Sequence, residues 1–301
     1  MTVAVVLVTG ATGLIGRQTV APLAARGFRV LAASRSGRVM DGAEPLALDC
    51  LDRAAVTAAL NKHRPSHLLH LAWADGLSER WTAPANLSWV GASLDLIQAF
   101  AAAGGKRAVM VGSCAEYDWS LAAAGPMAET TPLRPASLYG AAKAATSLAA
   151  LAGAGRLGLS LAWARPFFCY GAGEPEGRLA GDLIRGLGAG RMVECTDGLQ
   201  QRDFLQTEDI GAALAALLAS EVTGAVNIGA GQAIAVRQLI GAIAGAMGQP
   251  GRVRLGARAR PGDDPPLIVA DVTRLRTEVG FVPRHDLASG VAALLAAEGD
   301  R

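Results

Sequence analysis

The feature that most constrains this chain lies near its start, where an apolar run meets a glycine-rich turn. Residues 3–9 are rich in valine, as in a strand that is buried on both faces of a parallel sheet. Gly10, Gly13 and Gly16 follow at three-residue spacing, and residues 17–26 have helical periodicity. Glycines let the backbone approach a pyrophosphate, and a helix N-terminus offers it free N–H groups. This order predicts a dinucleotide site, the alternative being a tight turn without a ligand.

Strands and helices alternate through the first half of the chain, which predicts an α/β protein with a Rossmann-type doubly wound parallel sheet over residues 1–170. Beyond residue 171, glycine and charge become frequent and the alternation loosens. We expect residues 171–301 to form mainly a smaller C-terminal substrate-binding lobe, with residues 203–229 returning to the first domain. The expected strands are 28–35, 46–50, 67–71, 106–112, 159–165 and 225–229, and the expected helices are 52–62, 86–103, 208–219, 236–247, 286–297 and the segment after residue 139.

Composition excludes several kinds of partner. A formal net charge of +2 lacks the basic excess of a nucleic-acid binder. Cys50, Cys114, Cys169 and Cys195 are widely separated, so neither a disulfide framework nor a metal site is expected. The apolar run at 3–8 is too short for a signal peptide, and no stretch approaches the roughly 18 apolar residues of a membrane span. We therefore expect a cytoplasmic protein with no nucleic-acid or membrane partner.

The end of the second strand bears on the choice of cofactor. An NAD site places Asp or Glu there to bind the ribose 2′-hydroxyl, whereas this chain has Ser34 and Arg35. A guanidinium suits a 2′-phosphate, which favours NADP(H), with NAD(H) still possible; alternatively, Arg35 simply points into solvent. Asp49 ends the next strand and either bonds the adenine amine or caps the following helix.

Tyr139 and Lys143 are four residues apart in an Ala-rich helical segment, so they share one helix face. A fixed ammonium beside a phenol favours the phenolate and lowers its pKa. The bland alternative is a packed aromatic ring and a solvated lysine. Ser113 follows the strand at 106–112, and ligand groups gather at the carboxyl ends of parallel strands. These three residues are the candidate catalytic groups.

Together, these motifs resemble those of the extended short-chain dehydrogenase/reductase family, in its nucleotide-sugar epimerase, dehydratase and reductase branch. Ser113 precedes Tyr139 by 26 positions and Tyr117 by four, which is similar to the family pattern. The resemblance implies that Tyr139 exchanges a proton with the substrate oxygen while Ser113 hydrogen-bonds that oxygen. It also implies that Lys143 lowers the pKa of Tyr139 and holds the nicotinamide ribose.

The resemblance further implies which residues hold the ligands and how the chain assembles. Arg202 and Arg260 match positions near the substrate's diphosphate, the alternative being that they only confer solubility. A homodimer through the helices around Asn86 and Tyr139 would be similar to relatives. The expected cofactor contacts are Gly10, Thr12, Gly13, Leu14, Ile15, Gly16, Ser34, Arg35, Asp49, Cys50, Leu71, Ala72, Trp73, Tyr139, Lys143 and Pro166; the expected substrate contacts are Ser113, Glu116, Phe168, Arg202 and Arg260.

Departures from the family pattern narrow the reaction. Dehydratases of this family carry Asp-Glu directly after the catalytic Thr, whereas this chain has Cys114 and Ala115, with Glu116 one position late. Phe168 stands where epimerases commonly carry an Asn. The sequence therefore predicts an NADPH-dependent ketoreductase of a 4-keto-6-deoxy nucleotide sugar. One alternative is an NAD-dependent nucleotide-sugar C4 epimerase. Another is a catalytically silent protein that senses or binds NADP(H).

Overall fold

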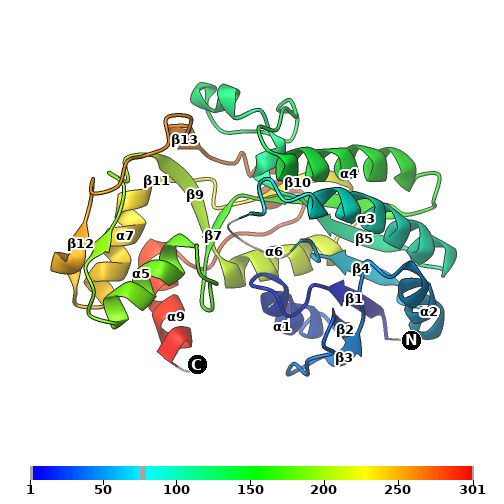
Figure 1. Cartoon of the computed structure of the whole chain (residues 1–301). Helices are drawn as coiled ribbons and strands as arrows, with labels where there is room; N and C mark the ends of the chain where they lie inside the picture. Colours follow the sequence, from blue (N-terminus) through cyan, green and yellow to red (C-terminus); the bar gives the residue numbers. More distant parts are fainter. Residues whose placement is uncertain (1–2, 75–78, 300–301) are drawn as a thin grey trace.

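The structure is a computed structural model that describes residues 3–74 and 79–299. Within that part of the chain, seven strands form one sheet in the order β3-β2-β1-β4-β5-β6-β10, and every neighbouring pair is parallel. Helices flank the sheet (Figure 1). The predicted Rossmann-type doubly wound sheet is therefore confirmed. The strands are β1 (Val5–Thr9), β2 (Arg29–Ser34), β3 (Glu44–Ala47), β4 (His67–His70), β5 (Arg107–Val111), β6 (Ser160–Pro166) and β10 (Gly224–Ile228).

Each face of this sheet has its own hydrophobic core, because successive side chains of a strand point to opposite sides. In β1, Val6 and Val8 pack with residues of α1 (Val20–Ala24) and α6 (Thr207–Ala219). Leu7, which lies between them, packs with the three helices on the other face. Burial on both faces explains the continuous apolar runs of the sequence. Those three helices are α2 (Arg53–His63), α3 (Ala85–Ala102) and α4 (Leu138–Ala154).

Two elements of the first domain differ from the sequence expectation. The helix expected at 17–26 is a 3-10 turn, η1 (Gly16–Thr19), followed by the short α1. The third strand ends at Ala47, so Asp49 lies beyond it and accepts a hydrogen bond from the Leu51 N–H (2.9 Å). The cap of α2 is instead Asp52, whose carboxylate accepts two backbone N–H groups, which rules out the capping alternative for Asp49.

The smaller lobe lies at the left of Figure 1 and combines segments that are distant in sequence. Leu183, Ile243 and Leu294 come from three different helices and meet in its hydrophobic core. Its helices are α5 (Leu179–Gly188), α7 (Val236–Ala246) and α9 (Leu287–Gly299), and its strands are β7 (Phe168–Tyr170), β8 (Val193–Glu194), β9 (Gln201–Gln206), β11 (Ala233–Ala235), β12 (Val253–Arg254) and β13 (Leu267–Ile268).

The chain returns from this lobe to the main sheet through α6 and β10. β9 pairs with β7, β11 and β13 of the lobe, so the return begins at Thr207. β10 then adds to the edge of the large sheet beside β6, and α8 (Thr273–Thr277) contacts it. None of the helices among the described residues is both long enough and apolar enough to span a bilayer.

Candidate active site

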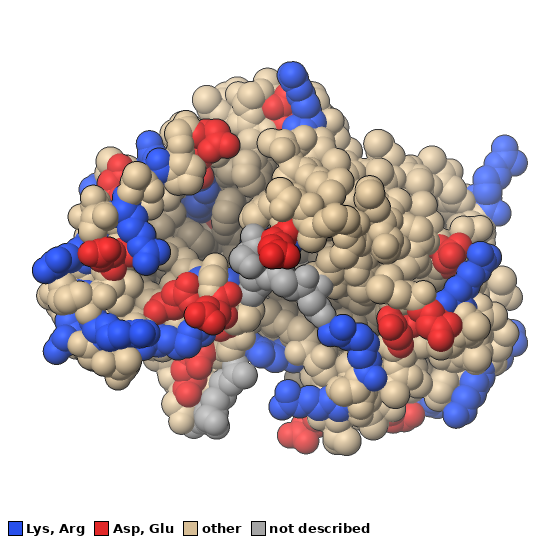
Figure 2. Space-filling model, viewed as in Figure 1, with Lys and Arg blue, Asp and Glu red and all other residues tan. Residues whose placement is uncertain are grey.

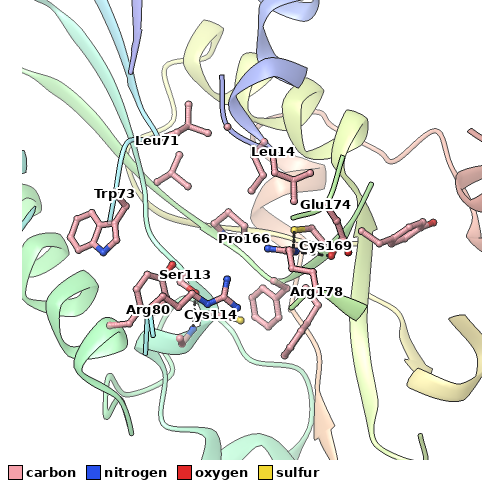
Figure 3. A pocket seen from close by; sticks show the side chains of 18 of the residues that line it. Leu14, Leu71, Trp73, Arg80, Ser113, Cys114, Pro166, Cys169, Glu174 and Arg178 are labelled. Atoms are coloured by element: carbon pink, nitrogen blue, oxygen red, sulfur yellow. Dashed lines mark hydrogen bonds and ion pairs between the residues drawn. The ribbon is translucent and has the colours of Figure 1, made fainter. Parts of the chain in front are cut away.

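A cavity of about 470 Å³ lies at the carboxyl ends of the central strands. β1 and β4 are neighbours, but the chain continues from β1 toward β2 on one side and from β4 toward β5 on the other. The connections that leave their carboxyl ends therefore diverge, and a crevice opens between the two halves of the sheet. Figure 3 shows side chains from both the sheet and the lobe around this cavity. The predicted site residues that line it are Gly10, Gly13, Leu14, Ile15, Gly16, Leu71, Trp73, Ser113, Tyr139, Lys143, Pro166 and Phe168.

The glycine turn is packed too closely for side chains at two positions. Gly10 has a φ of +68°, and a Cβ there would lie 2.8 Å from the backbone nitrogen of Ala72. A Cβ on Gly16 would overlap the carbonyl oxygen of Gly10. Gly10, Gly13 and Gly16, which carry no side chains, line the cavity beside the start of η1. This arrangement fits the pyrophosphate of a dinucleotide, which needs close approach to backbone N–H groups.

Helix α4 brings Tyr139 to the same place as Ser113. Ser137 caps the helix by accepting the Gly140 N–H (3.1 Å). A Cβ on Gly140 would overlap the carbonyl oxygen of Ala115, so α4 packs directly on η2 (Cys114–Glu116). The first turn of α4 therefore lies against the loop that carries Ser113, and both side chains line the cavity.

The Tyr139 phenol is held in its protonated form. Burial raises the pKa of Tyr139 to about 12, and a hydrogen bond from Ser113 and the positive charge of Arg80 oppose this rise. The ring of Trp81 packs edge-on against the phenol, with 5.5 Å between ring centroids. Arg80 is a cation near the phenol that the sequence analysis did not consider, and the expectation that Lys143 lowers the pKa of Tyr139 stays a prediction. A protonated phenol is a proton donor.

Lys143 lines the cavity, and its side chain is buried. It donates a hydrogen bond to the Val111 carbonyl oxygen (2.7 Å) and lies 3.6 Å from the centre of the Trp73 ring. Burial lowers the pKa of Lys143 to about 7, against the attraction of the Glu116 carboxylate. This lysine therefore changes charge near neutral pH.

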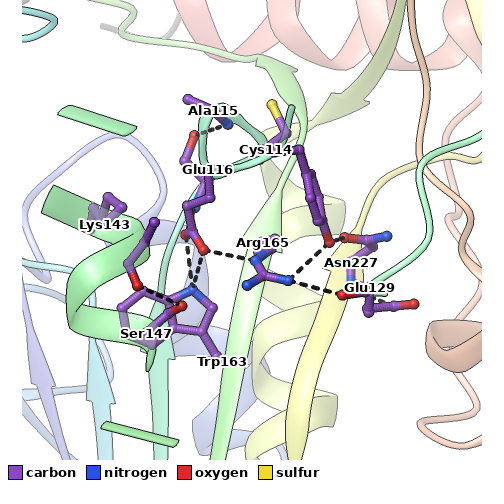
Figure 4. Close-up of polar contacts among 12 residues, drawn as sticks. Cys114, Ala115, Glu116, Glu129, Lys143, Ser147, Trp163, Arg165 and Asn227 are labelled. Atoms are coloured by element: carbon purple, nitrogen blue, oxygen red, sulfur yellow. Dashed lines mark hydrogen bonds and ion pairs between the residues drawn. The ribbon is translucent and has the colours of Figure 1, made fainter. Parts of the chain in front are cut away.

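Glu116 corrects a sequence prediction. Its carboxylate is fully buried and accepts hydrogen bonds from the Ser113 N–H (2.8 Å), Trp163 Nε1 (2.9 Å) and Arg165 Nε (2.8 Å). Figure 4 shows Glu116 between Trp163 and Arg165. Arg165 in turn donates to the Tyr117 hydroxyl (3.1 Å). Glu116 thus points into the core and does not line the cavity. The expectation that it contacts substrate is wrong, because its oxygens are already occupied by donors.

Several predicted cofactor residues lie outside this cavity. The Ser34 hydroxyl at the end of β2 accepts the Arg38 N–H (3.3 Å), and Arg35 next to it is exposed. Cys50 is buried, and burial raises the pKa of its thiol to about 12, so it is an inert packing residue. The full set outside the cavity is Thr12, Ser34, Arg35, Asp49, Cys50 and Ala72. Their contacts with a cofactor stay a prediction.

The predicted substrate arginines occupy different surroundings. Arg202 lies 5.3 Å from the centre of the Phe168 ring, forms an ion pair with Asp264, and lines a second cavity of about 1100 Å³. Phe168 lines both cavities, so they adjoin. Arg260 is exposed, sits 3.9 Å from Asp197, and lines neither cavity. The structure therefore brings Phe168 and Arg202 together, whereas Arg260 stays outside both cavities, although burial and, to a lesser extent, the positive charge of Arg260 lower the pKa of Arg202.

Two cavity arginines escaped the sequence analysis. Arg80 lies beside Ser113 and Cys114 in Figure 3, and its buried Nε has no hydrogen-bond partner. Arg178 donates to the Cys169 carbonyl oxygen (3.1 Å) and lies 3.5 Å from the Glu174 carboxylate. Neither residue is part of a recognisable sequence motif. Arg80 lies in the connection before α3, and Arg178 lies directly before α5. Only the tertiary fold places them in the cavity.

Comparisons with known proteins agree with this geometry. The model of the NAD dependent epimerase/dehydratase family matches residues 6–229. A UDP-glucose 4-epimerase of Rhizobium leguminosarum bv. trifolii is 30% identical, over 94% of each chain. A dTDP-6-deoxy-L-talose 4-dehydrogenase (NAD(P)(+)) of Kitasatospora kifunensis is also 30% identical, over 97% of this chain and 95% of the relative.

A solved structure extends the likeness to three dimensions. MoeE5 in complex with UDP-glucose and NAD is 31% identical to this chain, covers 98% of both chains and has a TM-score of 0.84. The family match covers the strand, glycine turn, Ser113, Tyr139 and Lys143. The chain therefore belongs to the NAD dependent epimerase/dehydratase family and is an NAD(P)-dependent oxidoreductase.

Proposed function

We propose that this chain is an NADPH-dependent ketoreductase that acts on a 4-keto-6-deoxy nucleotide sugar. The observation that carries the proposal is the cavity in which Ser113, Tyr139 and Lys143 meet beside the glycine turn. A bound NADPH would supply the hydride. Tyr139 would donate its proton to the carbonyl oxygen as the carbon is reduced. The Ser113 hydroxyl would hold that oxygen by a hydrogen bond.

The residues around Ser113 argue against dehydration. Eliminating water across two sugar carbons needs an acid and a base beside the substrate. Cys114 and Ala115 line the cavity at the positions where dehydratases of the family carry that pair. The nearby carboxylate of Glu116 forms an ion pair with Arg165. Among the described lining residues, Glu174 is the only carboxylate, and it pairs with Arg178.

The similar 4-dehydrogenase supports the substrate class. Its name describes oxidation at C4 of a 6-deoxy nucleotide sugar with NAD(P)⁺, which is the reverse of the reduction proposed here. The second cavity, lined by Phe168 and Arg202, provides space and a guanidinium for the nucleotide diphosphate.

A nucleotide-sugar C4 epimerase is the second candidate, favoured by the similar UDP-glucose 4-epimerase and by the NAD in the MoeE5 complex. An epimerase oxidises and re-reduces the same carbon, so it recycles its cofactor and needs no added reductant. Phe168 at the position of the epimerase Asn weakens this reading.

The two candidates are separated by following NADPH absorbance with a panel of 4-keto and 4-hydroxy nucleotide sugars. A reductase consumes one NADPH for each 4-keto sugar reduced. An epimerase interconverts the 4-hydroxy sugars with no NADPH consumed, and purifies with NAD. If neither reaction is seen, a catalytically silent NADP(H)-binding protein becomes the better reading, and NADPH binding by calorimetry tests it.

Arg35 supports the preference for NADPH, since it is exposed just beyond β2, where the adenosine ribose of a Rossmann cofactor lies. We expect Arg35→Asp to shift the NADPH/NADH ratio of kcat/KM toward NADH by on the order of tenfold or more, since a charge-assisted bond is worth about 1.5–3 kcal/mol. Arg53→Asp, at an exposed position of α2, is the control. An unchanged ratio would show that Arg35 does not read the 2′-phosphate.

We also propose a homodimer through α3 and α4. Leu87 on α3 and Leu148 on α4 are each 62% exposed, and Figure 2 shows few charged side chains over these helices. Light scattering should report a dimer for the wild type and a monomer for Leu148→Asp. A monomeric wild type would disprove this assembly.

A further inference from the structure

Trp73 makes a contact with a catalytic group that the family motifs do not explain. It follows β4, lines the active-site cavity, and presents its ring face to the Lys143 ammonium at 3.6 Å. The same ammonium has one backbone acceptor, the Val111 carbonyl oxygen. A cation over an indole face is attracted by the ring quadrupole, and most strongly where water is excluded. The contact therefore stabilises a positive charge that burial disfavours.

Asn86 holds the indole in this orientation. Its side-chain oxygen accepts the Trp73 Nε1–H (2.8 Å), and its amide donates to the backbone carbonyls of Arg80 and Ala83 (2.8 Å each). Asn86 is fully buried. Trp89 also stacks on Trp73, with 6.0 Å between centroids and 27° between planes. With one edge bonded and one face stacked, Trp73 has little freedom to rotate away from Lys143.

We propose that Trp73 is a positioning residue that fixes the Lys143 ammonium and favours its charged form. The inference rests on the proposed function, because it assigns Lys143 the task of holding the cofactor ribose. A protonated Lys143 keeps its remaining N–H groups for that ribose, whereas a neutral amine donates more weakly. Trp73 thereby extends the pH range over which the site is competent.

The other charged or titratable groups around Lys143 do not replace this contribution. Glu116 attracts the ammonium but is already bonded to Arg165 and Trp163. His70 on β4 is buried between Thr9 and Ser93, and burial lowers its pKa to about 3, so it is neutral. Tyr139 is protonated. The indole face is thus the one further stabilising contact that the described residues give the ammonium.

The test measures the pKa of Lys143 directly by NMR of the lysine side chains, in protein without cofactor or substrate. The chain has only three lysines, and Lys62 and Lys106 are exposed and serve as internal references. Replacing all tryptophans with mono-, di- and trifluorinated analogues keeps the ring shape while it weakens the attraction of the ring face. We expect the pKa of Lys143 to fall stepwise, by about one unit in total.

Two variants serve as matched controls for the other four tryptophans. In Trp73→Phe, fluorinating the remaining tryptophans should leave the pKa of Lys143 constant. In Trp89→Phe, which removes a ring that stacks on Trp73 without lying over Lys143, the stepwise fall should persist. A wild-type pKa that ignores fluorination overturns the proposal, as does an equal fall in Trp73→Phe. The wild-type series can overturn the proposal even if a variant fails to fold.

The outcome is independent of the reaction catalysed. If the pKa falls as expected but no carbonyl substrate is reduced, the proposed function fails and the Trp73 inference stands. In active enzyme, the direction of the shift in the pH profile follows from the need for a charged Lys143. Activity is lost as pH rises through the pKa of Lys143, so fluorination should move that loss to lower pH by the same shift.

Discussion

Two groups of charges near the active-site cavity differ in how far the protein itself satisfies them. The Glu116–Arg165 pair is closed, because its carboxylate accepts three donors and its guanidinium reaches Tyr117. Two of the cavity cations, Arg80 and Lys143, are open, since the Arg80 Nε has no hydrogen-bond partner and Lys143 has one carbonyl oxygen and a ring face. Charged groups whose hydrogen bonds are all made within the protein hold the strand ends in place, whereas charged groups with unused donors are available to bind ligands. The distinction predicts which substitutions damage stability and which damage catalysis.

Tyr139→Phe is expected to have the largest effect on the site that contains the open cations. Loss of the proton donor should reduce kcat by about 10²–10⁴-fold, the usual contribution of general acid catalysis. The melting temperature should stay within a few degrees of wild type, because the ring and its packing against Trp81 are kept. Stopped-flow NADPH oxidation and calorimetry measure the two quantities. A fully active variant would refute the assignment of Tyr139 as the acid.

Glu116→Ala tests the closed group. Removing one partner of a buried ion pair leaves Arg165 uncompensated and should lower the free energy of unfolding by about 3–5 kcal/mol. Urea denaturation measures this change. The double variant Glu116→Met with Arg165→Met removes both charges and should lose less than Glu116→Ala. Equal losses would show that the pair is not the source of the effect.

Arg80→Met separates electrostatics from packing at the open site. Without the guanidinium, the pKa of Tyr139 should rise further, so the phenol becomes a weaker acid. A change of one pKa unit corresponds to 1.36 kcal/mol, and we expect the single-turnover rate at pH 7 to fall on the order of tenfold. Arg80→Lys should recover part of the rate, and Arg156→Met, at an exposed position, should have no effect. A wild-type rate in Arg80→Met would show that Arg80 does not act on Tyr139.

The two predicted substrate arginines provide the smallest contrast. Arg202 is buried at the second cavity, so Arg202→Met should raise the KM for the nucleotide sugar on the order of tenfold. Arg260 is exposed and 3.9 Å from Asp197, a kind of pair worth about 0–1 kcal/mol, so Arg260→Met should change KM less than about twofold. Equal effects would mean that Arg260 reaches the substrate despite its exposed position.

The sequence alone determined the Rossmann-type sheet and nominated the candidate catalytic groups. Buried parallel strands are apolar over most of their length, so β1, β5 and β6 could be recognised without knowledge of their neighbours. The glycine turn and the Tyr139–Lys143 spacing are local patterns, because each depends on geometry within one turn of the chain. Short lobe strands such as β8 and β12 leave no such pattern, since two residues have no period.

What only the tertiary structure decided is the surroundings of those groups. Ser113 and Glu116 are three residues apart, yet one faces the cavity and the other the core, because the η2 turn points them in different directions. Arg80 and Trp73 reach Tyr139 and Lys143 across long sequence separations. The pKa of a buried group depends on every charge and dipole packed around it. No spacing rule contains that information, because the neighbours come from different elements that meet only when the chain is folded.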